Sequence, residues 1–343
     1  MTSEVMESHP RFHYHSRRVK AFTYRGARDM DRRELFQALM SGAGLGAIGS
    51  LGNPAEGASL PRAGTSAGAV PFVQVRDGTR LFYQDWGSGR PLLFVAPWAL
   101  NSSWWEYQMA HLAAQGFRCI AYDRRGHGRS DQPGRGYEFD TLADDLHTLI
   151  ERLDLRDVTL VGHSMGCAEV VRYLSRHGAS RASRAALVAT TTPFIMKADT
   201  NPDGIPKSAL EKGRATLSKD RAHQIGIAAP AFFGAPANAV SQEVMDWWVR
   251  MMVDQCSLST MLELHRAFTE TDFRPDLRRI TLPTLLIHGD SDSSARIDLT
   301  ARKTLPLIPG SRLTVYEGAA HGLPITHMDR LNADITAFAR GQA

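Results

Sequence analysis

The feature that most constrains the fold is a Gly-x-Ser-x-Gly pentapeptide between a strand-like and a helix-like segment. The pentapeptide is Gly162-His163-Ser164-Met165-Gly166; the apolar run 158–161 precedes it, and residues 167–175 follow with a helical pattern. Small residues two positions either side of the serine let a strand and a helix pack closely around a sharp turn, which exposes the hydroxyl. The pattern predicts a nucleophile elbow with Ser164 at its tip, although the pentapeptide alone also occurs by chance.

A serine at such a turn needs two partners. Its hydroxyl is a weak nucleophile at neutral pH, so a histidine must accept the proton and a carboxylate must orient that histidine. With a nucleophile elbow, the expected chain order is Ser, then Asp or Glu, then His, each at the carboxyl end of a strand. The strand-like run 283–287 leads into Asp290 and Asp292, and the strand-like run 312–316 leads into His321. The chain therefore supplies acid and base candidates in the expected order.

The order of predicted elements indicates an α/β fold. An antiparallel pair opens the sheet, and the later strands alternate with helical patterns, which is typical of a doubly wound, mostly parallel sheet. The eight predicted strands are residues 72–75, 81–84, 91–95, 118–122, 157–161, 184–189, 283–287 and 312–316. The predicted helices lie near residues 104–115, 140–153, 166–177, 295–304 and 328–340.

The segment of about ninety residues between the last two internal strands is too long for an ordinary connection. It predicts a helical cap inserted at about residues 192–275 of a single domain, residues 70–343. Most apolar cap residues are expected to pack among themselves, while Phe194, Trp248 and, outside the cap, Trp98 are candidates for lining an acyl pocket. The cap shows no cluster of charge for an ionised substrate, which favours a small or medium uncharged ester.

Several further motifs stand in a fixed order along the chain. They are Tyr122 to Ser130 (YDRRGHGRS), the pentapeptide, Phe268 to Phe273 (FTETDF), His288 to Asp292 (HGDSD), and His321-Gly322 followed by Thr326-His327. Together they resemble the α/β-hydrolase superfamily, and specifically its group of cofactor-free haloperoxidases, perhydrolases and arylesterases. The resemblance covers roughly residues 71–341. It implies an α/β-hydrolase fold, with an eight-stranded sheet and a helical cap.

The resemblance also implies roles for single residues. Ser164 is then the nucleophile, Asp292 the acid and His321 the general base. Asp292 is preferred to Asp290 because the family places its acid three residues after the glycine that follows the strand; Asp290 is then a turn residue that binds local backbone N–H groups. His327 is the alternative to His321, but it lies near the start of the final helix rather than directly after a strand.

An oxyanion hole is implied by the same resemblance, built from the backbone N–H groups of Met165 and Trp98. The chain departs from the family here, because Ala96-Pro97 replaces the usual His-Gly, and proline has no N–H to donate. In many perhydrolase-like relatives a proline follows this tryptophan and resembles a device that moves its carbonyl toward a peroxide. This chain has Ala99 instead, so ester hydrolysis is favoured over peracid formation.

The favoured function is therefore a serine hydrolase that acts on uncharged carboxylic esters through an acyl-enzyme. The alternative is a cofactor-free haloperoxidase or perhydrolase that forms a peracid from a carboxylic acid and hydrogen peroxide, and a non-catalytic ligand-binding protein is a third. No metal or other cofactor is implied, because the chain has no His-Glu-x-x-His, cysteine-pair or phosphate-loop spacing. The oligomeric state stays open.

Residues 1–69 resemble a twin-arginine export signal with a linker. Arg32-Arg33 precedes a weakly apolar, glycine-rich run, residues 38–51, which is too short for a stable membrane span. The expected partner is the twin-arginine export machinery, and the expected destination is the periplasm or the medium. Initiation at Met30 would make residues 1–29 a mis-assigned start. The alternative is a disordered tail with a chance arginine pair, which would leave the protein in the cytoplasm.

Charge and cysteine content separate this segment from the rest. Residues 1–69 contain nine Lys or Arg and six Asp or Glu, so most of the formal net charge of +4 lies there. The remaining chain is nearly neutral, and nucleic acid is not an expected partner. Three cysteines do not make a disulfide framework. Cys119 and Cys167 fall on core elements and are expected to be buried thiols.

Overall fold

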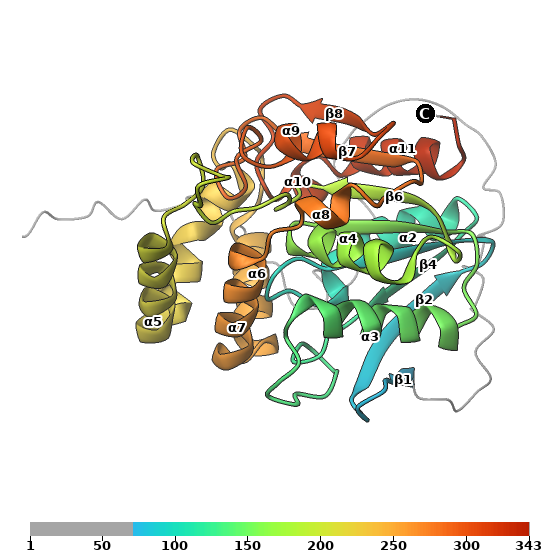
Figure 1. Ribbon diagram of the computed structural model, residues 1–343, viewed down its shortest axis with the longest axis horizontal. Helices are drawn as coiled ribbons and strands as arrows, with labels where there is room; N and C mark the ends of the chain where they lie inside the picture. Colours follow the sequence, from blue (N-terminus) through green and yellow to red (C-terminus); the bar gives the residue numbers. More distant parts are fainter. Residues whose placement is uncertain (1–70, 343) are drawn as a thin grey trace, which may run out of the picture. The chain divides into compact units, whose positions relative to one another are not determined.

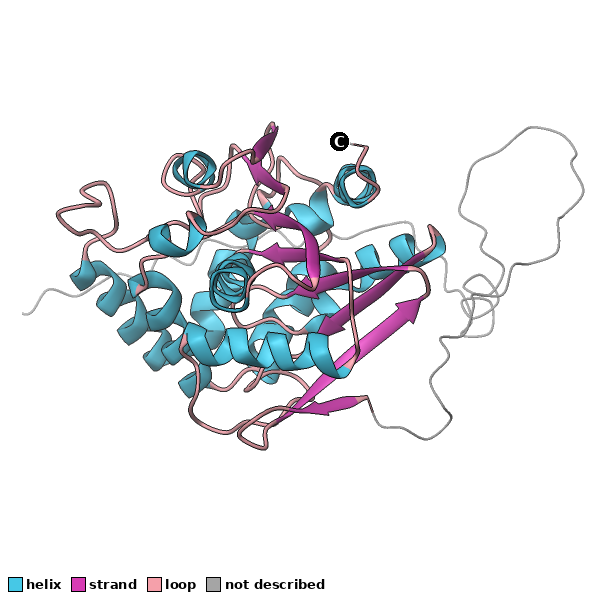
Figure 2. Ribbon diagram, turned by 45° about the vertical axis from the view of Figure 1, so that its right-hand side comes forward, coloured by secondary structure: helices cyan, strands magenta, loops and turns pink. Residues whose placement is uncertain are grey.

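The computed structural model describes residues 71–342. The predicted export signal and linker, residues 1–69, and the alternative start at Met30 lie outside the described residues. In the described part, eight strands form one sheet in the order β1-β2-β4-β3-β5-β6-β7-β8, with helices on both faces (Figures 1 and 2). The strands are β1 (Phe72–Gln74), β2 (Arg80–Gly87), β3 (Arg90–Val95), β4 (Phe117–Tyr122), β5 (Val158–His163), β6 (Ala182–Val188), β7 (Thr284–Gly289) and β8 (Arg312–Tyr316).

The strand directions confirm the predicted fold class. Strand β1 pairs antiparallel with β2, and β2 pairs antiparallel with β4, whereas every pairing from β4 through β8 is parallel. All residues of β5 and β7 are buried. A parallel strand covered by helices on both faces has no solvent side, which is why these strands read as apolar runs rather than alternating patterns.

The sheet separates two hydrophobic cores. Side chains alternate along a strand, so Leu93 of β3 faces one core and Phe94 faces the other. The core at Leu93 is covered by helices α3 (Phe139–Arg152) and α4 (Met165–His177), and the core at Phe94 by α2 (Glu106–Ala114) and α11 (Met328–Ala339). A 3-10 turn (Ser102–Trp105) leads into α2, and a short helix α10 (Leu323–Thr326) precedes α11.

One predicted helix is wrong over most of its length. Residues 295–304 were expected to be helical, but helix α9 covers only Ala301–Thr304 and continues as a 3-10 turn, Leu305–Leu307. The backbone N–H of Ala295 donates to the Asp292 carboxylate, and the Thr300 hydroxyl donates to the Ala295 carbonyl. These local bonds hold the segment in turns around the carboxylate and so replace the helical ladder.

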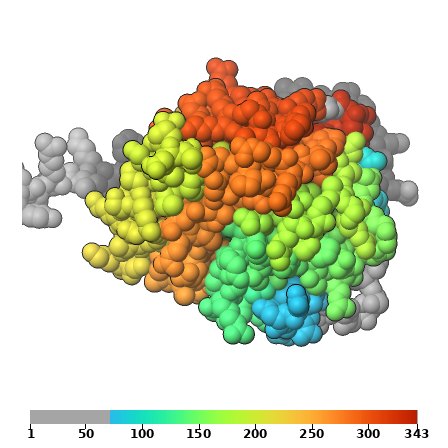
Figure 3. Space-filling model, in the orientation of Figure 1, coloured from blue at the N-terminus to red at the C-terminus, as the bar shows by residue number. Residues whose placement is uncertain are grey.

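Between β6 and β7 the chain forms four helices, in the stretch predicted as a cap. They are α5 (Lys207–Phe233), α6 (Gln242–Gln255), α7 (Leu258–Glu270) and α8 (Arg274–Leu277). Helix α5 is kinked at Asp220 (φ −156°, ψ 79°), whose carboxylate then accepts the N–H of His223 and starts the second half. Helix α5 packs against α6 and α7, and its surface (olive to yellow) adjoins that of α7 (orange) in Figure 3.

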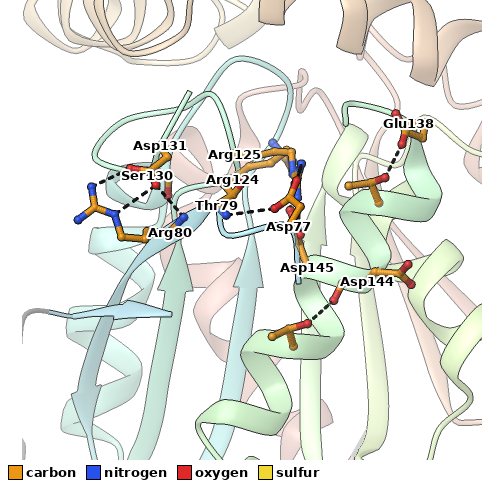
Figure 4. Close-up of polar contacts among 12 residues, drawn as sticks. Asp77, Thr79, Arg80, Arg124, Arg125, Ser130, Asp131, Glu138, Asp144 and Asp145 are labelled. Carbon is orange, nitrogen blue, oxygen red and sulfur yellow. Dashed lines mark hydrogen bonds and ion pairs between the residues drawn. The ribbon is translucent and has the colours of Figure 1, made fainter. Parts of the chain in front are cut away.

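The loop after β4 is anchored by its arginines. Arg125 is almost fully buried and pairs with Asp145 of α3 at 2.6 Å and with Asp77 of the β1–β2 turn at 2.9 Å. Arg80 forms a solvent-exposed ion pair with Asp131, and Figure 4 shows it together with Arg125 and its partners. Part of the YDRRGHGRS motif therefore ties the loop to the first strands and to α3. Within residues 71–342, no helix is both long and apolar enough to cross a membrane.

Candidate active site

Ser164 occupies the turn between β5 and α4, as the pentapeptide predicts. Its backbone has φ 55° and ψ −120°, a region that non-glycine residues rarely adopt. A Cβ at Gly166 would lie 2.4 Å from the carbonyl oxygen of Val95, and one at Gly162 would lie 2.8 Å from the Cys167 backbone. The close approach of strand β3, strand β5 and helix α4 therefore requires both glycines, and the strain of the turn is held at Ser164.

Three predicted residues form one hydrogen-bonded chain. His321 Nε2 lies 2.8 Å from Ser164 Oγ, and His321 Nδ1 lies 2.6 Å from Asp292 Oδ2. Asp292 follows β7 and His321 follows β8, so adjacent strand ends place both beside the turn after β5. All three side chains are buried. In this geometry the imidazole can accept the serine proton while the carboxylate orients and stabilises the resulting imidazolium.

The Asp292 carboxylate is held as an anion. Its Oδ1 accepts the N–H groups of Ser294 and Ala295, each at 2.8 Å, and His288 Nε2 lies 3.2 Å from Oδ2. Burial alone would raise the pKa of this carboxyl, but the neighbouring His321 and His288 and their hydrogen bonds outweigh it and hold the pKa well below its usual range. Asp292 therefore stays ionised at neutral pH.

The alternative acid and base make other contacts. The Asp290 carboxylate is exposed and accepts the N–H of Gly318 at 2.8 Å, as a turn residue does. His327 Nδ1 lies 2.9 Å from the Thr326 hydroxyl, and its ring packs against Tyr316 at the start of α11. Among the described residues, neither side chain hydrogen-bonds to Ser164.

His163 is a supporting residue whose role the sequence leaves unspecified. The Trp104 indole Nε1 donates to His163 Nδ1 at 3.0 Å, and an indole N–H can only donate, so Nδ1 carries the lone pair. Nε2–H then donates to the His321 carbonyl at 3.0 Å. Burial and the adjacent His321 hold the pKa of His163 well below its usual range, so it stays neutral. His163 thus ties the turn at Ser164 to the loop that carries His321.

The two proposed oxyanion donors are available. Met165 is the first residue of α4, where a backbone N–H has no partner within its own helix. Neither this N–H nor that of Trp98 donates to another described residue. The Ala96–Pro97 peptide is trans, and the next turn of the loop places Ala99 at φ 59°.

A buried ion pair positions the loop that carries Trp98. Arg124 Nη2 donates to the Ala96 carbonyl at 2.8 Å, and Arg124 Nε donates to Glu169 at 2.7 Å. Glu169 lies on α4, one turn beyond Met165, and neither charged side chain of the pair is more than 2% exposed. The contact holds the Trp98 loop and the start of α4 in a fixed relation. Sequence reasoning missed this pair, because no local pattern shows that Arg124 reaches across to another helix.

Ser164 and His321 line a cavity of about 440 Å³ together with residues of helices α5, α6 and α7. Of the three predicted pocket residues, Trp98 and Trp248 line it. Within the described part, none of the lining residues is Asp, Glu, Lys or Arg, and no group of three or more His, Cys, Asp or Glu side chains is arranged to hold a metal ion. The cavity therefore suits an uncharged, largely apolar ligand.

Phe194 does not line this cavity, contrary to its prediction as a pocket residue. It borders a separate cavity of about 80 Å³, and the Arg274 guanidinium lies 5.3 Å from its ring centre. The Asn201 amide donates to the Phe194 carbonyl at 2.9 Å and folds the loop back on itself. The next residue, Ile195, borders both cavities.

Comparison with known proteins agrees with this geometry. A family model described as the alpha/beta hydrolase fold matches residues 90–327. The non-heme haloperoxidase of Rhodococcus erythropolis is 41% identical over 273 residues, which cover 78% of this chain and 99% of that protein. The bifunctional esterase/perhydrolase DCH of Acinetobacter calcoaceticus is 34% identical over 275 residues, which cover 78% and 99%.

Solved structures show the same likeness. A bromoperoxidase from Bacillus anthracis superposes with a TM-score of 0.73 at 35% identity, over 76% of this chain and 96% of that chain. The esterase EaEST from Exiguobacterium antarcticum superposes with a TM-score of 0.75 at 30% identity, over 79% and 100%. With the eight-stranded sheet and the serine turn already described, these matches show that the chain belongs to the α/β-hydrolase fold family, in its group of cofactor-free haloperoxidases, perhydrolases and esterases.

Proposed function

We propose that this protein hydrolyses small to medium uncharged carboxylic esters through an acyl-enzyme on Ser164. The observation that carries the proposal is the hydrogen-bonded series from Asp292 through His321 to the Ser164 hydroxyl. This hydroxyl opens into a cavity that no described Asp, Glu, Lys or Arg side chain lines. The names of the esterase and esterase/perhydrolase relatives support the same reaction class.

The geometry suggests the following cycle. His321 Nε2 takes the proton from Ser164 as Oγ attacks the ester carbonyl, and the N–H groups of Met165 and Trp98 bind the oxyanion. The intermediate collapses, His321 donates its proton to the leaving alcohol, and the acyl group remains on Ser164. Water then repeats the sequence and releases the carboxylic acid. Asp292 keeps the imidazole oriented and stabilises its cationic form throughout.

Peracid formation is the second candidate, and the names of the haloperoxidase relatives favour it. A carboxylic acid would acylate Ser164 with loss of water, and hydrogen peroxide would then attack the acyl-enzyme to release the peracid, which oxidises halide in solution. The Ala99 backbone at φ 59° is a conformation that proline cannot adopt. The loop here therefore differs from one built around a proline, and we expect hydrolysis to be the faster reaction.

The first test is hydrolysis of p-nitrophenyl acetate, butyrate and octanoate by the full chain. Ser164→Ala should lower kcat by at least about 10³-fold, because it removes the nucleophile. Asp292→Asn should lower kcat by about 10³-fold to 10⁴-fold. Asp290→Asn is the matched control, two residues away, and should change kcat less than about twofold, because this carboxylate only binds a turn.

Equal effects of the two aspartate substitutions would contradict the assignment of Asp292. An unchanged rate in Ser164→Ala would contradict the acyl-enzyme. The same proteins are then assayed with acetate, hydrogen peroxide and bromide, with bromination of monochlorodimedone as the readout. Ser164-dependent bromination without turnover of any ester would make peracid formation the main reaction.

We further propose that residues 1–69 direct export by the twin-arginine machinery. The support is Arg32-Arg33 ahead of the short apolar run 38–51. Replacing both arginines with lysine should retain the protein in the cytoplasm, whereas the same change at Arg17-Arg18, which no apolar run follows, should leave export intact. Cell fractionation and immunoblotting measure both. Identical distributions of the two variants would contradict the proposal.

A further inference from the structure

One imidazole in the cavity wall has no function in the proposed cycle. The other polar lining side chains outside the Ser164–His321 pair are uncharged, namely Thr191, Thr216, Gln224 and Ser294. His265 of α7 lines the cavity beside Trp98, whose ring centre lies 5.7 Å away, and Phe268, at 5.2 Å. Both aromatic rings meet the imidazole edge to face. Trp98 is itself held to α7 by its indole N–H, which donates to the Met261 carbonyl at 2.9 Å. His265 is therefore part of the wall next to the predicted oxyanion donor.

Neither ring nitrogen of His265 has a hydrogen-bond partner among the described residues. Nδ1 is fully buried, whereas Nε2 is not among the fully buried unpartnered atoms, and His265 lines the cavity. Burial, helped by the nearby Arg214 cation, lowers the pKa of His265 to about 4, so the ring is neutral at pH 7. A neutral imidazole carries one N–H donor and one lone pair. Nε2 can thus offer one neutral hydrogen bond to a molecule in the cavity.

An apolar side chain at position 265 would be at least as stable as histidine in this packing. Leaving a buried polar atom without a partner is unfavourable, and replacing it with an apolar group of similar shape is close to neutral or stabilising. Two aromatic rings pack against the imidazole, and neither ring nitrogen hydrogen-bonds to a described residue. Packing alone therefore does not account for a polar ring at this position, and Nε2 is the atom through which it can bind a ligand.

We propose that His265 Nε2 hydrogen-bonds a hydroxyl group of the substrate, so that the preferred esters carry a hydroxyl in the chain that enters this cavity. A hydroxyl both donates and accepts, and so it fits either tautomer of the ring. Among the described residues, no Asp, Glu, Lys or Arg side chain lines the cavity, which argues for this neutral group over a carboxylate or an amine. The inference rests on the proposed ester hydrolysis and names its substrate class.

The test compares esters that differ only by hydroxyl against methyl. The pairs are p-nitrophenyl 3-hydroxybutanoate with 3-methylbutanoate, p-nitrophenyl 6-hydroxyhexanoate with heptanoate, and 4-hydroxybutyl acetate with pentyl acetate. The quantity is the ratio of kcat/KM within each pair, for the full chain and for His265→Leu. In at least one pair the ratio should fall about 10-fold in His265→Leu, as expected for the loss of one hydrogen bond.

Two further variants separate a hydrogen bond from a change of shape. His265→Gln keeps a hydrogen-bonding end and should retain most of the hydroxyl preference. His111→Leu removes an exposed histidine of α2 and should leave every ratio unchanged. The melting temperature of His265→Leu should equal or exceed that of the wild type, since a buried unpaired nitrogen is removed.

Equal ratios in the wild type and His265→Leu for all three pairs would overturn the inference. Equal losses in the Leu and Gln variants would also overturn it and assign the ring a steric role. These outcomes differ from failure of the proposed function. In that case the wild type would turn over neither the hydroxyl nor the methyl esters, or would turn them over equally well after Ser164→Ala.

Discussion

At the scale of single residues, the contribution of an ion pair to the stability of this protein depends on how deeply its charges are buried. Arg124 and Glu169 form an ion pair with side chains 2% and 0% exposed, and Tyr122 also hydrogen-bonds to Glu169. Arg80 and Asp131 form a pair of similar geometry whose arginine is 61% exposed. Water and salt screen the charges of the exposed pair. In the interior no solvent can compensate a charge that has lost its partner.

Glu169→Gln should therefore lower the free energy of unfolding by about 3–5 kcal/mol, because the Arg124 charge stays buried without its counter-ion. Urea unfolding followed by tryptophan fluorescence measures the change. Asp131→Asn is the control and should change stability far less. Activity should fall in Glu169→Gln beyond the loss of folded protein, because Arg124 also holds the Ala96 carbonyl in the Trp98 loop. Equal stability losses in the two variants would contradict the role of burial.

At the scale of elements, helix α5 forms one wall of the cavity and offers a matched pair of glycines. Gly213 lines the cavity, and Gly226 lies on the second half of the same helix without lining it. An added Cβ would meet no atom within 4 Å at either position, and neither backbone needs a positive φ. The two sites therefore allow one methyl group to be placed inside or outside the cavity.

Gly213→Ala should shorten the cavity and lower kcat/KM for p-nitrophenyl octanoate by about 10-fold, while acetate hydrolysis stays nearly unchanged. Gly226→Ala should leave the chain-length profile intact. Both substitutions should raise the free energy of unfolding by up to about 1 kcal/mol, since alanine is the better helix former. Steady-state kinetics on the acetate-to-octanoate series measures kcat/KM for each acyl chain length. A common chain-length profile for both variants would show that α5 does not bound the acyl site.

Across the whole molecule, the two cores on either side of the sheet enclose all three cysteines. Burial raises the pKa of Cys119 and of Cys256 to about 12 and raises that of Cys167 further. Because each pKa lies above the working pH, each sulfur remains a thiol rather than the reactive thiolate.

A disulfide exchange reagent such as DTNB at pH 8 should therefore titrate none of the three thiols in the native protein during the time in which free cysteine reacts completely. In guanidinium chloride all three should react. Absorbance of the released thionitrobenzoate counts them. A stoichiometric fast-reacting thiol in the native state would contradict the burial of these side chains.

The sequence by itself determined the strand and helix order, the antiparallel opening pair and the sharp turn at Ser164. These features depend on local periodicity and on glycines at fixed spacing, which adjacent residues specify. It also placed Asp292 and His321 after successive strands, and the parallel sheet brings such strand ends together. The false helix at residues 295–304 shows the limit, because there the nearby Asp292 carboxylate takes up the backbone N–H groups of Ser294 and Ala295, and helical periodicity does not show this competing bond.

Only the tertiary structure decided which side chains meet across elements. Ile195 rather than Phe194 reaches the main cavity, because Asn201 folds the loop back. The tautomer of His163 follows from Trp104, and Arg124 reaches Glu169 from another element. Each of these contacts joins residues far apart in the chain or depends on how a loop closes, so its free energy exists only once the sheet, the helices and the insert have packed.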